Sequence, residues 1–215
     1  MARLGRRAFA TPLRAGLSAL VLLLLFAGGR YAQWSTLGYR FATISPGRLY
    51  QSAQMPPAAL VETAQEYDIA TVVDLRERQE SAAEIDAEAQ ALEAAGVRYV
   101  HLPISYVPED RHIDAFLGVM QEHGDRPMLV HCEHGEGRSV MLAAVYRMEA
   151  EGQPPSEAMA RTVRLPDEMT WLRYLLPTLR RFGWDSEKGR FVRSYQLRGV
   201  ADETASRTTE QPQKN

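Results

Sequence analysis

Apolar and polar positions follow two different rhythms along the middle of this chain. Short runs of apolar and β-branched residues, typical of buried strands, are separated by longer stretches in which apolar residues recur every three or four positions, as on one face of a helix. The predicted strands span Arg40–Ile44, Leu49–Ser52, Ile69–Leu75, Val97–Leu102 and Met128–His131. The predicted helices span Pro56–Tyr67, Glu80–Ala95, Arg111–His123, Ser139–Glu151, Ser156–Val163 and Asp167–Phe182. This alternation predicts an α/β fold, with a central sheet of about four to five strands flanked by helices.

Two of these elements carry charges whose role can be anticipated. Asp74 and Arg76 stand at the end of the third predicted strand, where we expect them to pair and to bond the backbone rather than to act in catalysis. The helix over Glu80–Ala95 is rich in acidic residues, and we expect its charges to form a solvated face.

The N-terminus has a pattern of its own. Residues 1–14 contain four arginines and no acidic residue, and no charge interrupts the apolar segment Ala15–Gly29. This order is typical of a secretory signal, and the segment is shorter than the roughly 20 residues of a transmembrane helix. Small residues at its end would permit cleavage, but they do not form an A-x-A motif. Two hypotheses therefore stay open, a signal peptide that is removed and a signal anchor that is retained. The arginine excess predicts export across, or anchoring to, the bacterial cytoplasmic membrane, with the rest of the chain in the periplasm.

These patterns divide the chain into four parts. We expect a signal peptide or signal anchor over 1–30, a linker and first strand over 31–45, a folded domain over 46–198 and a disordered polar tail over 199–215.

Composition narrows the classes of function. The net charge of −2 gives no reason to expect a nucleic-acid partner, and 45% hydrophobic with 24% charged residues is ordinary for a globular domain. A single cysteine excludes a disulfide framework and a multi-cysteine metal site, and the five histidines lack zinc-ligand spacing. We therefore expect no metal and no cofactor.

The strongest chemical signal is the stretch His131-Cys132-Glu133-His134-Gly135-Glu136-Gly137-Arg138-Ser139, called the signature loop below. It lies between a predicted strand and a predicted helix, where backbone N–H groups and the helix dipole bind anions. Gly135 and Gly137 permit turns that side chains forbid. Arg138 has a planar fork that can hold two phosphate oxygens. Cys132, surrounded by these dipoles, should ionise readily and serve as a nucleophile.

A lone cysteine after a strand is more often a small buried hydrophobic residue without chemistry. The flanking histidine, the two glycines, Arg138 and Ser139 favour the catalytic interpretation here.

The spacing His-Cys, five residues, Arg, Ser resembles the signature of the cysteine-dependent protein tyrosine and dual-specificity phosphatases. Three upstream pieces, Leu49–Gln54, Thr71–Arg76 and His101–Ile104, look like the compact atypical dual-specificity branch, and the resemblance covers about residues 46 to 165. It implies a dual-specificity-phosphatase-like fold and hydrolysis of phosphate monoesters through a phosphocysteine on Cys132. Residues Glu133, His134, Gly135, Glu136, Gly137, Arg138 and Ser139 would then bind the substrate.

The resemblance also implies an upstream aspartate as general acid, which typically contributes 10²–10⁴-fold to the rate. Asp110 fits best, because it lies on the loop between a strand and a helix. It is also a suitable N-cap residue for that helix. Glu109, Asp114 and the two loop glutamates are weaker alternatives. Ser139 would hydrogen-bond the Cys132 sulfur or cap the next helix, and His131 would order the loop.

Two carboxylates in the loop, Glu133 and Glu136, would repel polyanionic substrates. We therefore expect a phosphorylated protein or a small phosphate ester as substrate, rather than an inositol polyphosphate. Three alternative hypotheses stay open: a lipid or inositol phosphate phosphatase, a non-catalytic phospho-binding module and a rhodanese-like sulfurtransferase. Contact with the membrane through the N-terminal segment would favour the first of these.

Overall fold

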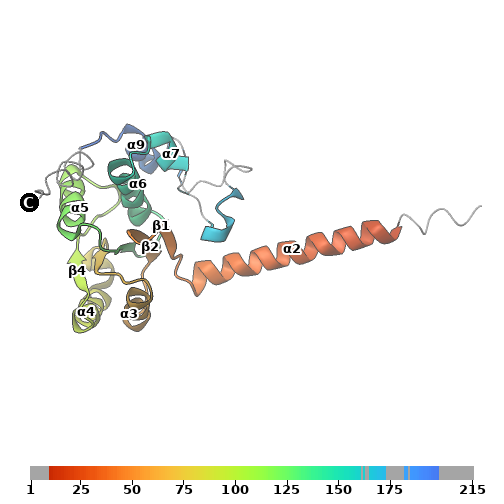
Figure 1. Cartoon of the computed structure of the whole chain (residues 1–215), viewed down its shortest axis with the longest axis horizontal. Coiled ribbons are helices and arrows are strands. Elements are labelled where there is room, and N and C mark those ends of the chain that lie inside the picture. Colours follow the sequence, from red (N-terminus) through yellow and green to blue (C-terminus); the bar gives the residue numbers. More distant parts are fainter. Residues whose placement is uncertain (1–9, 161, 163–164, 173–181, 184, 199–215) are drawn as a thin grey trace, which may run out of the picture. The chain divides into compact units, whose positions relative to one another are not determined.

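Five short strands form a single sheet in the order β1-β2-β5-β3-β4 (Figure 1). The strands are β1 (Ala42–Ser45), β2 (Leu49–Ala53), β3 (Thr71–Asp74), β4 (Arg98–His101) and β5 (Met128–Cys132). β1 is antiparallel to β2, and the other four strands are parallel. β5 lies between β2 and β3, so the loop at its carboxyl end opens where α/β sheets bind ligands.

The computed structural model describes residues 10–160, 162, 165–172, 182–183 and 185–198. The chain divides into two compact units, Met1–Gly38 and Tyr39–Asn215. The described helices of the second unit are α3 (Pro57–Glu66), α4 (Arg78–Ala94), α5 (Asp110–His123), α6 (Arg138–Ala150), α7 (Pro155–Ala160), the 3₁₀ turn η1 (Asp167–Met169) and α9 (Glu187–Ser194).

The helices cover both faces of the sheet (Figure 1). Alternate residues of a strand point to opposite faces, so Leu129 packs with Leu60 and Leu92 on the side of α3 and α4. Val130, its neighbour, packs with Phe116 of α5 on the side of α6. Cys132 has the same parity as Val130 and belongs to that second core. The register of β5 thus directs the cysteine toward α6.

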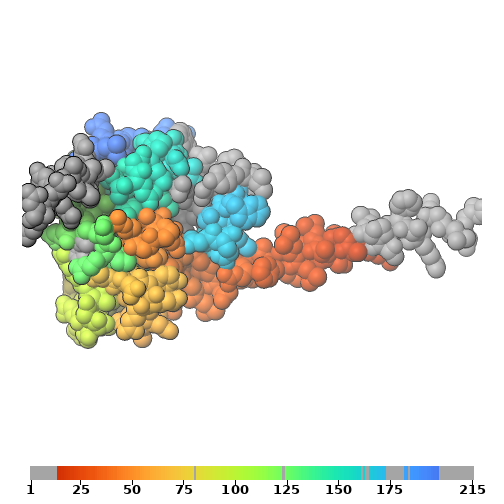
Figure 2. Space-filling model, in the orientation of Figure 1, coloured from red at the N-terminus to blue at the C-terminus, as the bar shows by residue number. Residues whose placement is uncertain are grey.

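The first unit contains one long helix, α2 (Ala10–Thr36). Its segment Arg14–Thr36 has 23 residues with a mean hydropathy of 1.6, which is long and apolar enough to cross a membrane. Large apolar side chains from Val21 to Phe26 are exposed along it. The described part of this helix is the red to orange rod in Figure 2. A signal sequence near an N-terminus has the same length and composition. The helix continues beyond residue 30, where we placed the end of the signal segment.

The sequence located the strands and most helices to within a few residues. The exceptions lie after α6. α7 is shorter than the helix predicted over Ser156–Val163. Of the helix predicted over Asp167–Phe182, the described residues form η1, the turn that follows it and one helical residue, Leu172. Residues 163 and 173–181, like the tail over 199–215, lie outside the described part of the chain. α9 was not predicted, although Ser186 caps it, with its hydroxyl accepting from the backbone N–H of Gly189.

Candidate active site

The two glycines of the signature loop are required for different reasons. Gly135 has a φ of +62°, and a Cβ there would stand 2.6 Å from the backbone nitrogen of Ala53 in β2. Gly137 caps α6 with a φ of −130° and a ψ of −88°. A Cβ at Gly137 would instead stand 2.6 Å from Nζ of Lys188. The expectation of backbone freedom is confirmed for Gly135, and at Gly137 the side chain of Lys188 from α9 also needs the space.

Cys132 ends β5, and only 2% of its surface is exposed. Its Sγ lies 3.3 Å from the hydroxyl of Ser139, the contact that the resemblance implied. Burial alone would raise the pKa of the thiol. The hydrogen bonds from Ser139 and the charge of Arg138 outweigh burial and lower that pKa. The site therefore favours a thiolate.

A side chain that the sequence analysis did not single out supports the loop from β2. Gln51, buried in the sheet, donates from Nε2 to the carbonyl of Gly135 at 3.1 Å and to the hydroxyl of Ser139 at 3.2 Å. Ser139 is the second residue of α6, after the cap at Gly137, so its hydroxyl serves the sulfur rather than the helix end.

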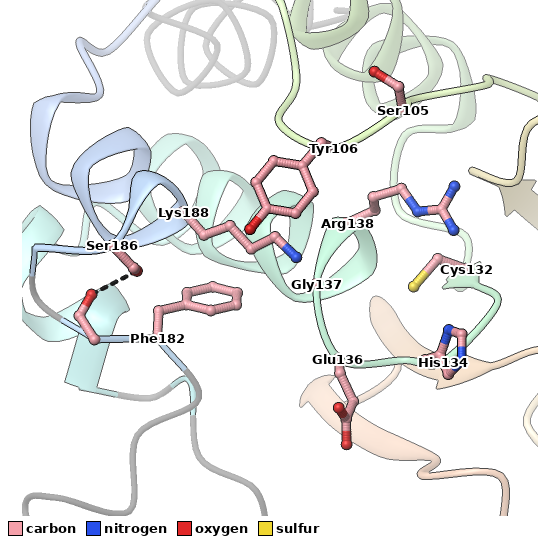
Figure 3. A pocket seen from close by; sticks show the side chains of 11 residues that line it. Ser105, Tyr106, Cys132, His134, Glu136, Gly137, Arg138, Phe182, Ser186 and Lys188 are labelled. Carbon is pink, nitrogen blue, oxygen red and sulfur yellow. Dashed lines mark hydrogen bonds between the residues drawn. The ribbon is translucent and has the colours of Figure 1, made fainter.

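Arg138 is held in place before any substrate binds. Its Nη1 donates to the carbonyls of Leu75, 3.2 Å away, and of Ile104, 3.0 Å away. These carbonyls follow β3 and β4, so the sheet itself orients the guanidinium. Arg138 is 8% exposed and lies beside Cys132 (Figure 3).

Cys132 and Arg138 share a pocket of about 440 Å³ (Figure 3). Its other lining residues are Ser105, Tyr106, His134, Glu136, Gly137, Phe182, Gly183, Ser186 and Lys188. Of the predicted substrate-binding residues, His134, Glu136, Gly137 and Arg138 line it, whereas Glu133, Gly135 and Ser139 do not. Three groups were missed: the loop after β4, which supplies Tyr106, the pair Phe182 and Gly183, and the start of α9, which supplies Lys188.

The two glutamates of the loop are partly neutralised. Arg40, which precedes β1, lies 3.3 Å from Glu136 and also donates to the carbonyl of His134. Oε2 of Glu133 lies 3.9 Å from Nη2 of Arg138 and 3.5 Å from Nδ1 of His134. The loop therefore repels anions less than its composition suggested.

Asp110, predicted as the general acid, is not part of this pocket. It is the first residue of α5, its side chain is 91% exposed, and its carboxylate pairs with Arg198. Arg198 also binds Asp114. Nor is Asp110 the N-cap: that residue is Glu109, which forms a reciprocal capping box with His112. The general-acid role of Asp110 stays a prediction, and its placement in the free protein does not support it.

A cluster of buried charges lies beneath the loop on the opposite face of the sheet. Nη2 of Arg76 lies 2.7 Å from both Asp74 and Glu88, and Nε2 of His131 lies 2.7 Å from Glu88. Burial alone would raise the pKa of Asp74, but His131 and Arg76 lower it to about 2. Burial alone would lower the pKa of His131, but Glu88 and Asp74 raise it. The expected pairing of Asp74 with Arg76 is confirmed.

This cluster corrects the expectation that α4 has only a solvated charged face, because Glu88 is 1% exposed. Ligand atoms of Asp74, Glu88 and His131 lie within 4.8 Å of one another, close enough to hold a metal ion. Arg76 already binds both carboxylates and would have to leave first. The residues therefore fit an ion-pair network better than a metal site.

Comparison with known proteins places this geometry in a family. A family model described as a DSP-PTPase phosphatase fused to NAD⁺ kinase matches residues 49–171. Among proteins of curated function, none matches the chain.

Several solved structures share the fold. TpbA from P. aeruginosa has 23% identity and a TM-score of 0.53, over 79% of this chain and 92% of that one. PTPMT1, solved in complex with PI(5)P, has 13% identity and a TM-score of 0.55, over 78% and 98% of the two chains. The core catalytic domain of the PP-IP phosphatase SIW14 from S. cerevisiae has 17% identity and a TM-score of 0.50, over 80% and 94%.

At these identities the solved structures establish the fold, and the family model establishes the family. The match begins at β2, ends just past η1 and includes the whole signature loop. Because it spans more than half of the chain, this protein belongs to the DSP-PTPase family, the cysteine-dependent phosphatases of the compact atypical dual-specificity type.

Proposed function

We propose that this phosphatase hydrolyses phosphate monoesters of the phosphotyrosine or dual-specificity type through a phosphocysteine on Cys132. The observation that carries the proposal is the shared pocket of Cys132 and Arg138, in which the thiol has a lowered pKa and the guanidinium is already oriented. A thiolate facing a cation and a helix N-terminus is arranged to attack a bound phosphate.

Three residues of the signature loop then have defined parts in the reaction. Arg138 and the loop amides bind the phosphate oxygens, and the Cys132 thiolate forms the S–P bond as the ester P–O bond breaks. Water then cleaves the phosphocysteine. Ser139, 3.3 Å from the sulfur, stabilises the thiolate that departs in this second step.

The walls of the pocket favour an aryl phosphate. Two aromatic side chains, Tyr106 and Phe182, line it together with the polar loop (Figure 3). Aromatic side chains can stack on the ring of a phenol, whereas the ring of an inositol is not aromatic and cannot stack in this way. A variant of the related TpbA has been solved in complex with pTyr, in agreement with this preference.

A lipid phosphate is the second candidate substrate. The observation in its favour is α2, whose length and apolar character suit a membrane anchor that would keep the enzyme near lipid. PTPMT1, which has the same fold, was solved in complex with PI(5)P.

A substrate panel separates these candidates. The full chain in detergent is assayed with chelator present against a phosphotyrosine peptide, a phosphoserine peptide and a short-chain phosphoinositide, with Cys132→Ser as the control. We expect the phosphotyrosine peptide to be hydrolysed fastest and the control to be inactive. A higher kcat/KM for the phosphoinositide would favour the lipid candidate. A wild type that hydrolyses none of them would favour a phospho-binding module.

We further propose that the N-terminal helix is a signal peptide or signal anchor and that the phosphatase unit faces the periplasm. The four arginines before the apolar segment support this orientation. Protease added to spheroplasts should digest the phosphatase unit, whereas digestion that requires lysis of the cells would contradict the orientation.

A further inference from the structure

The proposed reaction requires a proton donor, and the pocket offers few. The oxygen that leaves phosphorus must be protonated or strongly stabilised if it belongs to a poor leaving group. Among the described residues that line the pocket, Glu136 supplies the carboxylate, and it is paired with Arg40. Asp110 is paired elsewhere. The segment Pro103–Pro108, which supplies Ser105 and Tyr106 to the pocket, contains no acidic residue.

Lys188 lies where such a donor is needed. It belongs to the first turn of α9, which Ser186 caps, and it reaches from that helix toward the signature loop (Figure 3). Its Nζ lies close to Gly137: a Cβ at position 137 would stand 2.6 Å from it. The same Nζ lies 4.3 Å from the centroid of the Tyr106 ring, a cation–π contact that orients it. Lys188 therefore lines the pocket with Cys132, on a different side from Arg138 (Figure 3).

We propose that Lys188 is the general acid of this phosphatase, donating a proton from Nζ to the leaving-group oxygen as Cys132 attacks phosphorus. This inference rests on the proposed function and adds a catalytic residue to it.

The proposed steps conserve atoms and charge. In the first, the S–P bond forms, the P–O bond breaks, and the proton of the Lys188 ammonium passes to the departing oxygen, which leaves as a neutral alcohol or phenol. Lys188 is then a neutral amine. In the second, it accepts a proton from the water that attacks the phosphocysteine. The products are inorganic phosphate, the Cys132 thiolate and the Lys188 ammonium.

The charges around Lys188 suit this exchange. Burial lowers the pKa of its ammonium and Arg138 lowers it further, while Cys132 and Glu136 from the loop act in the opposite direction. Glu187, its neighbour on α9, also acts in that direction, and the net result is a pKa below the ordinary value. An ammonium with a lowered pKa releases its proton more readily.

The competing role for Lys188 is that of a cation that only binds phosphate. A fixed cation would accelerate all substrates by a similar factor. A proton donor matters most when the leaving group is a poor one, because a good leaving group departs as the anion unaided. The dependence on the leaving group therefore distinguishes the two roles.

The experiment compares kcat/KM for phenyl phosphate and 4-nitrophenyl phosphate in the full chain and in Lys188→Met, Lys188→Arg and Arg190→Met. We expect Lys188→Met to lose about 100-fold on phenyl phosphate and less than about tenfold on 4-nitrophenyl phosphate. Lys188→Arg should not restore the loss, because a guanidinium keeps its proton. The basic limb of the wild-type pH profile should disappear in Lys188→Met. Arg190→Met, which removes a cation from the exposed side of α9, should behave as wild type.

Two results would overturn the proposal: equal losses on both substrates in Lys188→Met, or restored activity in Lys188→Arg. Either would leave the phosphatase assignment intact. If instead the wild type hydrolyses neither ester faster than Cys132→Ser, the proposed function itself fails, and the role of Lys188 with it.

Discussion

Replacement of Arg76 by methionine tests the buried charge cluster beneath the active site. Arg76 is 1% exposed, and its guanidinium neutralises two carboxylates at 2.7 Å, Asp74 and Glu88. It also donates to Gln54 at 3.1 Å. Methionine occupies a similar volume without charge or hydrogen-bond donors. Among the described residues of the cluster, the variant therefore leaves His131 as the side chain that can still carry a positive charge beside the two buried carboxylates.

The expected cost is large because charges would be stranded, not because the ion pair is strong in itself. Breaking a buried pair by removing one partner costs about 3–5 kcal/mol. An exposed pair is worth about 0–1 kcal/mol. The chain provides a matched exposed pair two residues later: Arg78 bonds Asp86 at 2.9 Å, and the two side chains are 54% and 53% exposed.

Urea unfolding of the full chain in detergent, followed by tryptophan fluorescence, measures this difference. We expect Arg76→Met to lose about 3–5 kcal/mol of unfolding free energy and Arg78→Met no more than about 1 kcal/mol. Adding Glu88→Gln to Arg76→Met should recover part of the loss, because one stranded charge disappears. Equal destabilisation by the Arg76 and Arg78 variants would refute the idea that the cluster depends on charge balance.

Three further predictions concern the site and its support. Ser139→Ala removes the hydroxyl that bonds Cys132, so the pKa of the thiol should rise and alkylation by iodoacetamide near neutral pH should slow; an unchanged rate would contradict the hydrogen bond's role. Gly135→Ala should abolish phosphatase activity, because the loop cannot keep its positive φ or its approach to β2, and retained activity would show that the loop tolerates another shape. Because the pKa of His131 is raised in the folded state, its contribution to stability is complete below about pH 6.5 and is lost as pH rises through the folded-state value. Urea unfolding at increasing pH should show this decline, and Glu88→Gln should remove it.

Local patterns in the sequence were enough to predict the proposed reaction centre. Cys132, Arg138 and Ser139 lie on one strand–loop–helix segment, so their mutual geometry follows from short-range backbone structure. The strands and helices up to α6 could likewise be predicted. An element that buries one face must repeat its apolar residues with the period of a helix or a strand. The positive φ of Gly135 is also a local property, because it is a backbone conformation that glycine adopts more readily than other residues.

The rest of the site depends on which distant segments pack together, and the sequence contained no local signal for that. Asp110 has the residue type and order expected of a general acid, yet the packing of α5 turns it to solvent beside Arg198. Glu88 looked like part of a solvated face until β3 and β5 brought Arg76 and His131 against it.

Lys188 shows the same limit most clearly. It stands far from the signature loop in the chain and reaches the pocket because α9 packs against α6. Short-range periodicity determined the strand and the loop that carry Cys132. Long-range packing decided which charged side chains surround that cysteine, because contacts between distant segments depend on the burial of whole surfaces rather than on neighbouring residues.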